Sequence, residues 1–314
     1  MINKLGKNLQ GKTIAVFGAS SNIGRKFIQQ AARRGASVIA FVRDTSKVPS
    51  YSKRGAGSME AVMGDITRRK DVYKTLHGRS VEITINFAAD FSADFSKARA
   101  VNVIGEQNVV NSSIEYGVKR HIFISTIATL MPKQNAYRDT KLQAEKIVKA
   151  SGKKKLEWII LRYANVLGTR TWDHPFKIIF PYLRLGIPKV PTDANGAAFP
   201  YVTIETAIDT TLAAIESPPN QTITVFDGKI TIGEYLSTME KAYNIRVSFL
   251  PSRLLYILDK LFSKFLPSIK GYSAGVEFLA HPPLFENETM KEQLRIKTRS
   301  FQRWMQTHFL VKND

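Results

Sequence analysis

The stretch from Thr13 to Asp44 restricts the fold of this chain more than any other part of the sequence. Thr13–Phe17 is a short, β-rich apolar run followed by a glycine, and Ser37–Val42 is a second run typical of a buried strand. Between them, Asn22–Arg34 has apolar or small residues at helical spacing, at Ile23, Phe27, Ala31 and Ala32. A strand, a glycine-bearing turn, a helix and a strand within about thirty residues make a βαβ unit, in which the helix N-terminus receives the pyrophosphate of a dinucleotide.

The loop of this unit reads GASSNIG. Gly18 permits a tight turn, and Gly24 lets the helix approach the strand closely. The middle glycine of the usual dinucleotide fingerprint is absent, and Ser21 or Asn22 stands in its place. This leaves less room for a diphosphate but keeps small polar side chains that can donate hydrogen bonds to it. Because the glycines lie between a predicted strand and a predicted helix, we expect nucleotide binding rather than packing alone. The predicted binding residues are Gly18, Ser20, Ser21, Asn22, Ile23 and Gly24.

The end of the second strand indicates which nicotinamide cofactor is bound. An acidic residue there would hold the ribose hydroxyls of NAD, whereas an arginine can accommodate the 2′-phosphate of NADP. Arg43 comes first in this chain and Asp44 follows. We therefore predict a preference for NADP(H). NAD(H) is the alternative, because Asp44 could reach the ribose and Arg43 could be an ordinary solvated arginine.

The composition is that of a soluble globular protein. The chain has 314 residues, of which 44% are hydrophobic and 23% charged, enough to bury a substantial core. No apolar run is long enough to span a bilayer, and the first residues lack a signal-peptide core, so we expect a cytoplasmic protein. The absence of cysteine excludes disulfides, thiolate metal ligands and thiol catalysis.

The net charge of +20 favours anionic partners such as nucleotides, phosphorylated substrates or acidic lipid. The lysines and arginines are scattered, with one short run at Lys153–Lys155, and no signature of a nucleic-acid-binding module is present. We expect no specific nucleic-acid partner.

The rest of the first half alternates predicted strands with predicted helices. The strands are Met59–Met63, Val81–Asn86, His121–Ser125 and Glu157–Leu161, the helices are Arg69–Leu76, Ser96–Tyr116 and Tyr137–Ala150, and Thr45–Ser58 is a loop. This alternation predicts an α/β fold with a Rossmann-type, doubly wound parallel sheet.

The pattern is less regular after Gly168. Predicted helices cover Phe176–Leu185, Tyr201–Ile215 and Thr231–Tyr243, a strand covers Thr222–Phe226, and Gly186–Phe199 is a loop beside the substrate. We expect an NAD(P)-binding domain over residues 1–168, with returning segments near 200–228. A smaller, interleaved substrate-side lobe would cover residues 169–314.

Three polar residues near the end of the fifth strand could carry out proton transfer. Tyr137 and Lys141 are four residues apart on a predicted helix, so both side chains lie on one face. Thr126 follows the fifth strand, where parallel sheets bind ligands. An ammonium beside a phenol favours the phenolate, so we expect Lys141 to lower the pKa of Tyr137 below about 10. Thr126 could orient a substrate carbonyl or alcohol. A tyrosine and a lysine at this spacing are otherwise usually a solvated pair.

The chain resembles the extended short-chain dehydrogenase/reductases, which include NAD-dependent epimerases and dehydratases. The motifs that carry the resemblance lie at Gly18–Gly24, Gly64–Ile66, Asn86–Ala89, Val101–Val110, His121–Thr126, Tyr137–Lys141 and Leu161–Gly168. The resemblance implies that Tyr137 is the acid/base, that Lys141 binds the nicotinamide ribose, and that Thr126 completes the catalytic triad. It also places Asp65 and Ile66 beside the adenine, Ala88 along the cofactor, Asn102 in the fourth helix, and Asn165 and Val166 beside the nicotinamide and substrate.

The chain departs from this family in the segment between Thr126 and Tyr137. The link is short and lacks the Tyr-Gly pair usual in sugar-nucleotide epimerases and dehydratases. A trimmed loop is similar to that of an atypical branch, which includes the NADPH-binding accessory subunit of respiratory complex I. That subunit holds nucleotide without evident turnover, but the Tyr137/Lys141 pair is retained here.

Val247–Leu266 predicts an amphipathic helix with leucines and phenylalanines on one face and Arg253, Lys260 and Lys264 among its polar residues. Such a helix most often covers the substrate-side lobe. It could instead lie on an anionic membrane, making the protein peripheral to it, dock on a partner protein, or line a pocket for a lipophilic substrate. The histidines, at positions 77, 121, 174, 281 and 308, show no metal-ligand spacing, so no metal is assigned.

The preferred interpretation is an NADP(H)-dependent oxidoreductase or epimerase that moves hydride at a substrate alcohol or carbonyl. Sugar nucleotides and lipophilic alcohols or ketones are both candidate substrates, and a homodimer is a candidate assembly. The competing interpretation is a nucleotide-holding structural subunit of a larger or membrane-associated complex.

Overall fold

The computed structural model describes residues 8–49, 57–132, 134–168, 189–191, 196, 198–243, 248–250 and 286–308. The chain divides into two compact units. The first comprises Met1–Ala164, Ile204–Val225 and Glu286–Lys297, and the second comprises Asn165–Thr203, Phe226–Phe285 and Thr298–Asp314. Each unit is therefore made of segments that are distant in the sequence.

The first unit is built on a seven-stranded parallel sheet with the strand order β10-β6-β5-β4-β1-β2-β3. Its strands are β1 (Thr13–Phe17), β2 (Ser37–Val42), β3 (Ser58–Met63), β4 (Ile83–Asn86), β5 (Arg120–Thr126), β6 (Glu157–Tyr163) and β10 (Gln221–Val225). The order reverses between β1 and β4. In doubly wound sheets a dinucleotide binds beyond the carboxyl ends of the strands at this point. The predicted fold class is confirmed.

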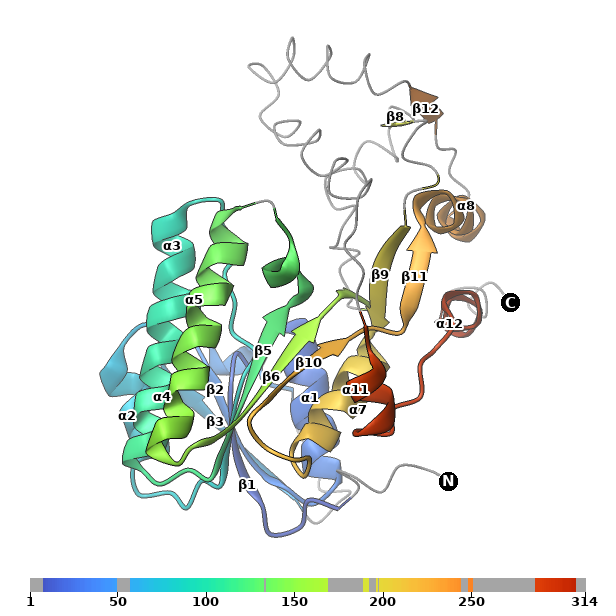
Figure 1. Cartoon of the computed structure of the whole chain (residues 1–314). Helices are drawn as coiled ribbons and strands as arrows, with labels where there is room; N and C mark the ends of the chain where they lie inside the picture. The colour runs from blue at the N-terminus through green and yellow to red at the C-terminus, as the bar shows by residue number, and fades with distance from the viewer. Residues whose placement is uncertain are drawn as a thin grey trace. The chain divides into compact units, whose positions relative to one another are not determined.

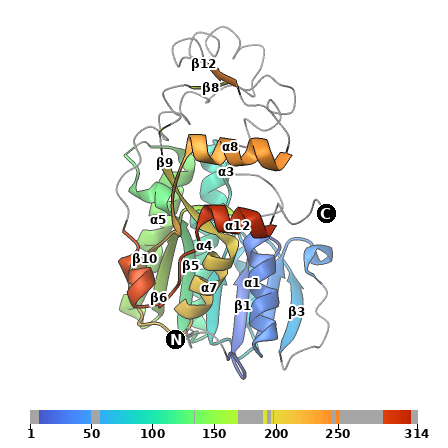
Figure 2. The same ribbon diagram turned by 90° about the vertical axis from the view of Figure 1, so that its right-hand side faces the viewer.

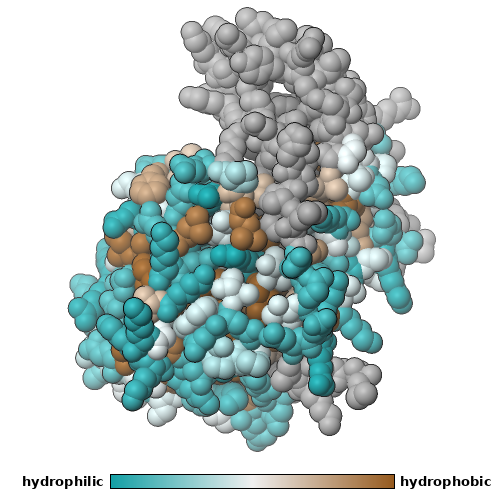
Figure 3. Space-filling view, in the orientation of Figure 1, coloured by the Kyte–Doolittle hydropathy of each residue, from teal (hydrophilic) through white to brown (hydrophobic). Residues whose placement is uncertain are grey.

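Helices cover both faces of this sheet (Figures 1 and 2). On one face lie α2 (Arg69–Leu76), α3 (Phe95–Arg99), α4 (Gly105–Glu115) and α5 (Ala136–Ser151), and on the other lie α1 (Asn22–Arg33) and α7 (Ile204–Ala214). Short helical turns are η1 (Thr45–Lys47), η3 (Ile127–Leu130) and η4 (Gly152–Lys154), and α11 (Glu288–Glu292) contacts β10. The outer face over α2–α5 is mainly hydrophilic with separate hydrophobic patches (Figure 3), as amphipathic helices require.

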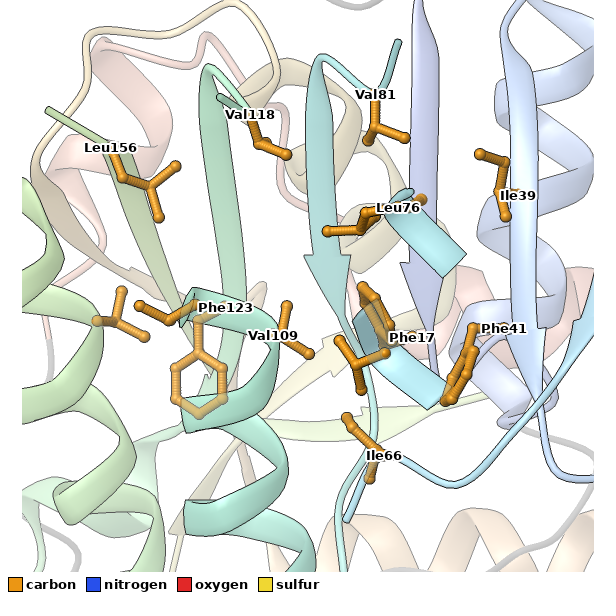
Figure 4. Close-up of a cluster of buried hydrophobic side chains, with 14 of the residues drawn as sticks. Phe17, Ile39, Phe41, Ile66, Leu76, Val81, Val109, Val118, Phe123 and Leu156 are labelled. Carbon is orange, nitrogen blue, oxygen red and sulfur yellow. The ribbon is translucent and has the colours of Figure 1, made fainter. Parts of the chain in front are cut away.

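The core of the first unit lies between the sheet and the α2–α5 layer. Phe17 and Phe41 come from adjacent strands, and their rings are 5.1 Å apart. Val109 from α4 and Phe123 from β5 extend this cluster across the sheet (Figure 4). Alternate residues of each strand therefore supply the apolar layer that holds the helices in place.

The long predicted helix over Ser96–Tyr116 contains an irregularity in its middle. A π-helical segment, η2 (Ala100–Ile104), separates α3 from α4. Asn102 lies in this segment and is buried. Its amide nitrogen donates to the backbone oxygen of Asp90 and to the Thr140 hydroxyl, and its amide oxygen accepts from the Asp90 N–H. Such π-bulges are frequently found at functional sites.

The second unit contains a three-stranded sheet of order β11-β9-β7 and a two-stranded sheet of β12 and β8. Its elements are β7 (Asn165–Leu167), β8 (Lys189–Pro191), β9 (Ala198–Thr203), β11 (Gly228–Thr231), α8 (Ile232–Tyr243), β12 (Ser248–Leu250) and α12 (Phe301–His308). The Asp227 carboxylate joins distant segments, because it accepts from both the N–H and the hydroxyl of Thr203 and from the Arg299 N–H.

Three secondary-structure predictions in the second half are corrected. The predicted loop Gly186–Phe199 contains β8 and the first residues of β9. The predicted helix Tyr201–Ile215 begins only at Ile204, because Tyr201–Thr203 complete β9. Ser248–Leu250, within the predicted helix Val247–Leu266, form the strand β12 instead. The rest of Val247–Leu266 and all of Phe176–Leu185 lie outside the described residues, so helices there stay predictions. In the part of the chain that the structure describes, no helix is long and apolar enough to cross a membrane.

Candidate nucleotide-binding and catalytic site

The loop after β1 requires glycine at Gly18 for two independent reasons. Its φ angle is +71°, in the left-handed region that side chains disfavour. A Cβ built there would lie only 2.4 Å from the backbone nitrogen of Ala88, in the loop after β4. The two loops that flank the reversal of strand order thus approach each other closely through backbone atoms.

The N-terminus of α1 faces the same loop. Ser21 is the N-cap, and its hydroxyl oxygen accepts from the Gly24 N–H at 3.0 Å. A Cβ at Gly24 would lie 2.4 Å from the Gly18 carbonyl oxygen, so this glycine allows the helix to start against the strand. Ser20, Asn22 and Ile23 are half-buried around this helix end. The positive end of the helix dipole suits an anion such as a pyrophosphate.

Arg43 and Asp44 follow β2 and have different surroundings. The Asp44 carboxylate caps η1, where it accepts from the N–H and hydroxyl of Ser46, and it lies 3.8 Å from the Lys47 ammonium. The hydrogen bonds from Ser46 lower the pKa of Asp44. Arg43 is exposed. Asp44 therefore has a local structural role, while the arginine faces solvent at the edge where a ribose would lie.

Asp65 follows β3 and is an ionised neighbour of Arg43. Its carboxylate accepts from the N–H and hydroxyl of Thr67 at 2.9 and 2.8 Å. The hydrogen bond from the Thr67 N–H is the largest contribution that lowers the pKa of Asp65, with burial opposing it and Arg68 and Arg43 adding to it. The carboxylate is thus charged and fixed in orientation at neutral pH.

Ile66 is buried against α4. A Cβ at Gly105 would lie 3.0 Å from the Ile66 side chain, so the glycine makes room for it. The side-chain nitrogen of Asn108 donates to the Ile66 backbone oxygen at 2.9 Å. These contacts fix the segment after β3 as one wall of the site.

Thr126 and Tyr137 come together at the end of β5. The Thr126 hydroxyl is hydrogen-bonded to the Tyr137 phenol and also accepts from the Ala128 N–H at 3.2 Å. The ring of Phe91, which is 61% exposed, covers the phenol at a centroid distance of 4.6 Å. Desolvation raises the pKa of Tyr137 well above its usual range, and the hydrogen bond with Thr126 opposes this rise. The predicted lowering of this pKa by Lys141 is therefore wrong for the protein without ligand, because dehydration dominates.

Lys141 projects from the next turn of α5 into the interior and is 1% exposed. Its ammonium donates to the Ile124 backbone oxygen at 2.5 Å and lies 4.0 Å from the centroid of the Phe123 ring. Burial lowers the pKa of Lys141 to about 8, and Glu106 and Glu145 act in the opposite direction. The lysine is thus held in a fixed position rather than solvated.

The predicted site residues fall into two groups. Gly18–Gly24, Arg43, Asp65, Ile66, Ala88 and Thr126 all follow or end strands of the parallel sheet, so they lie at its carboxyl edge, and Tyr137 and Lys141 reach this edge from α5. Asn165 and Val166 belong to β7 of the second unit, where the Asn165 side-chain nitrogen donates to the Pro200 backbone oxygen at 3.3 Å. Their predicted contact with nicotinamide stays a prediction. Within the described ranges, no cluster of three or more histidines and carboxylates could hold a metal ion.

Three residues of this region have roles that the sequence motifs did not assign. Phe91 lies in the loop after β4, where no pattern distinguishes it. Asn86 fixes that loop, because its amide oxygen accepts from the Ala88 N–H at 2.8 Å. Glu106 is fully buried and accepts from the Asn86 amide at 2.5 Å. Glu106 is four residues after Asn102 and shares its buried face. This spacing would have indicated that Glu106 is buried.

Comparison with known proteins identifies the class. Residues 18–173 match a family model described as NAD(P)H-binding. An inverting UDP-N-acetylglucosamine 4,6-dehydratase of Campylobacter jejuni is 28% identical over 178 residues, which are 53% of this chain and 52% of that protein. A 3-beta-hydroxysteroid dehydrogenase of Mycolicibacterium neoaurum is 25% identical over 158 residues, 43% of this chain and 42% of that one. The chain thus spans about half the length of the first of these relatives and less of the second.

The solved structures agree on the fold. UDP-glucose 4-epimerase of Thermotoga maritima, determined with UDP-glucose, superposes with a TM-score of 0.71 at 18% identity and covers 92% of this chain and 94% of its own. Residues 18–173 therefore match the NAD(P)H-binding family, the chain is similar to a UDP-sugar dehydratase over about half of its length, and its fold is that of the UDP-glucose 4-epimerase. The resemblance inferred from the sequence motifs is confirmed.

Proposed function

We propose that this protein is an NAD(P)-dependent oxidoreductase that removes and returns hydride at a hydroxyl-bearing carbon of a sugar nucleotide, as a 4-epimerase or a 4,6-dehydratase would. The observation that carries the proposal is the Thr126–Tyr137 hydrogen bond, with Lys141 fixed one helical turn further along α5. This arrangement lies at the same edge of the sheet as the loop at Gly18, where a Cβ would overlap the Ala88 backbone.

The nicotinamide supplies the hydride acceptor and donor when it is bound. Tyr137 exchanges the proton of the substrate hydroxyl, and Thr126 orients that hydroxyl through the hydrogen bond it shares with the phenol. Lys141 provides a fixed positive charge beside the acid/base pair. Since burial raises the pKa of the free phenol, Tyr137 begins the cycle protonated. Positive charge on an oxidised nicotinamide would favour the deprotonation of Tyr137.

We propose NADP(H) as the preferred cofactor. Asp44 is occupied as the cap of η1, whereas Arg43 is exposed beside the ionised Asp65. An arginine in this position supplies a charge-assisted hydrogen bond to a 2′-phosphate. NAD(H) is the alternative, and solved structures of similar fold carry NAD by their descriptions, such as the UDP-glucose 4-epimerase of Thermus thermophilus.

A sugar nucleotide is a better candidate substrate than a lipophilic alcohol because of the net charge of the chain. The net charge of +20 attracts a substrate with a diphosphate. The dehydratase and the epimerase described above act on UDP-sugars by their names. The steroid dehydrogenase keeps a lipophilic alcohol as the second candidate substrate.

The proposal is tested by turnover on a panel of UDP- and dTDP-sugars, with a 3β-hydroxysteroid as the lipophilic arm. Products are followed by NMR, and the nucleotide bound to the purified protein is released and identified. Tyr137→Phe removes the proton-exchanging hydroxyl, so activity should fall by a factor of about 10² to 10⁴ while nucleotide binding persists.

Tyr116→Phe is the matched control, because this hydroxyl contacts His77 at the C-terminal end of α4, away from the sheet's carboxyl edge. It should retain the wild-type rate. Bound nucleotide without turnover on the whole panel would contradict the enzyme and favour a nucleotide-holding structural subunit. Equal activity of wild type and Tyr137→Phe would remove the assigned acid/base role.

A further inference from the structure

Three ionisable side chains from the neighbouring helices, those of Glu106, Lys141 and Glu145, lie in a row over one face of β5. His121, Phe123 and Ser125 alternate along the strand and point to the same face. The Glu106 carboxylate contacts the His121 ring at 2.6 Å, the Lys141 ammonium lies over the Phe123 ring, and the Ser125 hydroxyl donates to Glu145 at 2.7 Å. Since same-face residues of a strand repeat every ~6.6 Å, Lys141 lies between two buried carboxylates.

The two carboxylates differ in how their charge is neutralised. Glu145 is 2% exposed and receives two hydrogen bonds from the Arg162 guanidinium, at 2.9 and 2.6 Å. It forms an ion pair that needs no further cation. Glu106 is 0% exposed, and among the described residues its hydrogen-bond donors are the Asn86 amide and the His121 ring.

Neither donor has to carry a charge to satisfy Glu106. A neutral imidazole donates through Nε2 to the carboxylate while its Nδ1 accepts a hydrogen bond. The His121 Nδ1 lies 2.9 Å from the Thr84 hydroxyl, which in turn lies 3.0 Å from the Ser113 hydroxyl. This chain of hydroxyl groups can supply the hydrogen. The negative charge of Glu106 is then balanced by the ammonium over the next same-face residue of β5.

We propose that Glu106 is the buried counter-ion that keeps Lys141 in its ammonium form. Glu106 is a positioning residue, since it acts through Lys141. The same carboxylate orients Asn86, which holds the Ala88 loop against Gly18, so one side chain serves both the lysine and the nucleotide-binding loop. The inference rests on the proposed function of Lys141. The charged and titratable groups around Lys141 are Glu106, His121, Tyr137, Glu145 and Arg162.

The test is a direct titration of Lys141 in the full chain by NMR with ¹³C-labelled lysine, with the signal assigned from a Lys141→Arg variant. In wild type, we expect Lys141 to titrate near pH 8, because burial lowers its pKa to about 8. In Glu106→Gln it should titrate about one pH unit lower or more, because loss of a nearby opposite charge favours the neutral amine. Glu106→Asp keeps the charge, so the pKa of Lys141 in this variant should lie close to its wild-type value.

Ser113→Ala is the control for a general disturbance of the hydrogen-bonded chain, because it removes the end hydroxyl and no charge. It should leave the titration of Lys141 unchanged. If Glu106→Gln does not fold, the double variant Glu106→Gln/His121→Gln removes the same charge and keeps a hydrogen-bonding pair. An unchanged Lys141 pKa in the folded uncharged variant would overturn the proposal, as would an equal decrease in Ser113→Ala.

The pH profile of turnover separates this inference from the proposed function. The activity of wild type should decline as the pH rises through the Lys141 pKa, and in Glu106→Gln this decline should begin at lower pH. If no variant turns over any substrate but Lys141 still titrates lower in Glu106→Gln, the proposed function fails and the counter-ion role stands.

Discussion

Replacement of Gly18 by alanine should be far more damaging than replacement of other glycines with the same backbone conformation. Two costs add at Gly18. The left-handed φ of +71° costs an alanine about 1–2 kcal/mol. The overlap of the new Cβ with the Ala88 backbone nitrogen at 2.4 Å adds about 1–3 kcal/mol, because it can be relieved only by moving backbone. We expect the free energy of unfolding to fall by about 2–5 kcal/mol.

Gly78 and Gly117 separate the two costs. Their φ angles are +70° and +64°, and a Cβ at either position would meet nothing within 4 Å. Gly78→Ala and Gly117→Ala should each lower the free energy of unfolding by only about 1–2 kcal/mol.

Urea unfolding of all three variants and of wild type measures these differences. NADPH titration, monitored by fluorescence, reports the second consequence. Displacement of the Ala88 loop should weaken nucleotide binding in Gly18→Ala and leave it unchanged in Gly78→Ala and Gly117→Ala. Equal destabilisation of the three variants, with nucleotide affinity retained in Gly18→Ala, would refute the argument that close contact of the two loops forms the nucleotide-binding site.

Three further predictions follow from other contacts. Arg43→Ala should weaken NADPH binding roughly ten- to a hundredfold and NADH binding much less, while Lys47→Ala should change neither; equal losses for both nucleotides would contradict the cofactor preference. Arg120→Met should lower the free energy of unfolding by roughly 3–5 kcal/mol, because the Arg120 guanidinium binds Glu157 and the backbone oxygens of Ala214 and Ile215. Lys12→Met, which breaks a half-exposed pair with Glu82, should lower the free energy of unfolding by less than about 1 kcal/mol in the same urea experiment. Because burial lowers the pKa of Lys141 from 10.5 to about 8, the unfolded chain binds more protons between these pH values, so wild-type stability should rise with pH relative to Lys141→Met; a difference that does not vary with pH would contradict this.

The first half of the chain could be predicted from the sequence because its periodicities are strong and local. The predicted bounds Thr13–Phe17, Ser37–Val42 and Arg69–Leu76 agree with β1, β2 and α2. Each of these segments has apolar residues at the spacing of one kind of element. The resemblance to a known family then supplied the residues whose roles no local pattern defines, Asn102 among them.

Two strands of the second unit, β8 and β9, were missed for a physical reason. Pro200 lies in the middle of β9 and Pro191 ends β8, and proline lacks the N–H that a strand normally contributes. Proline therefore argues for a loop in any interpretation based on local pattern. Only the pairing of β9 with β7 and β11, which are distant in sequence, makes these residues a strand.

The direction in which the pKa of Tyr137 is shifted could not be predicted from spacing alone. The distance in sequence between Tyr137 and Lys141 is correct for a common face, but the Lys141 ammonium is turned to the Ile124 carbonyl and the phenol is covered by Phe91. Solvation depends on loops that meet only in the folded protein. The row of Glu106, Lys141 and Glu145 over β5 likewise depends on α4 and α5, which pack side by side, with α4 on β4 and α5 on β5.

The π-helical segment at Ala100–Ile104 makes this chain tolerant of a change in length at one point. A π turn holds one more residue than an α turn, so a single deletion there would restore a regular helix. The residues beyond that deletion would keep their places around the helix axis, with Glu106 and Val109 still buried. A single deletion within the regular α4 would instead rotate every later residue of the helix by about 100°. Homologues of this chain should therefore gain or lose one residue within Ala100–Ile104 more readily than between Gly105 and Glu115.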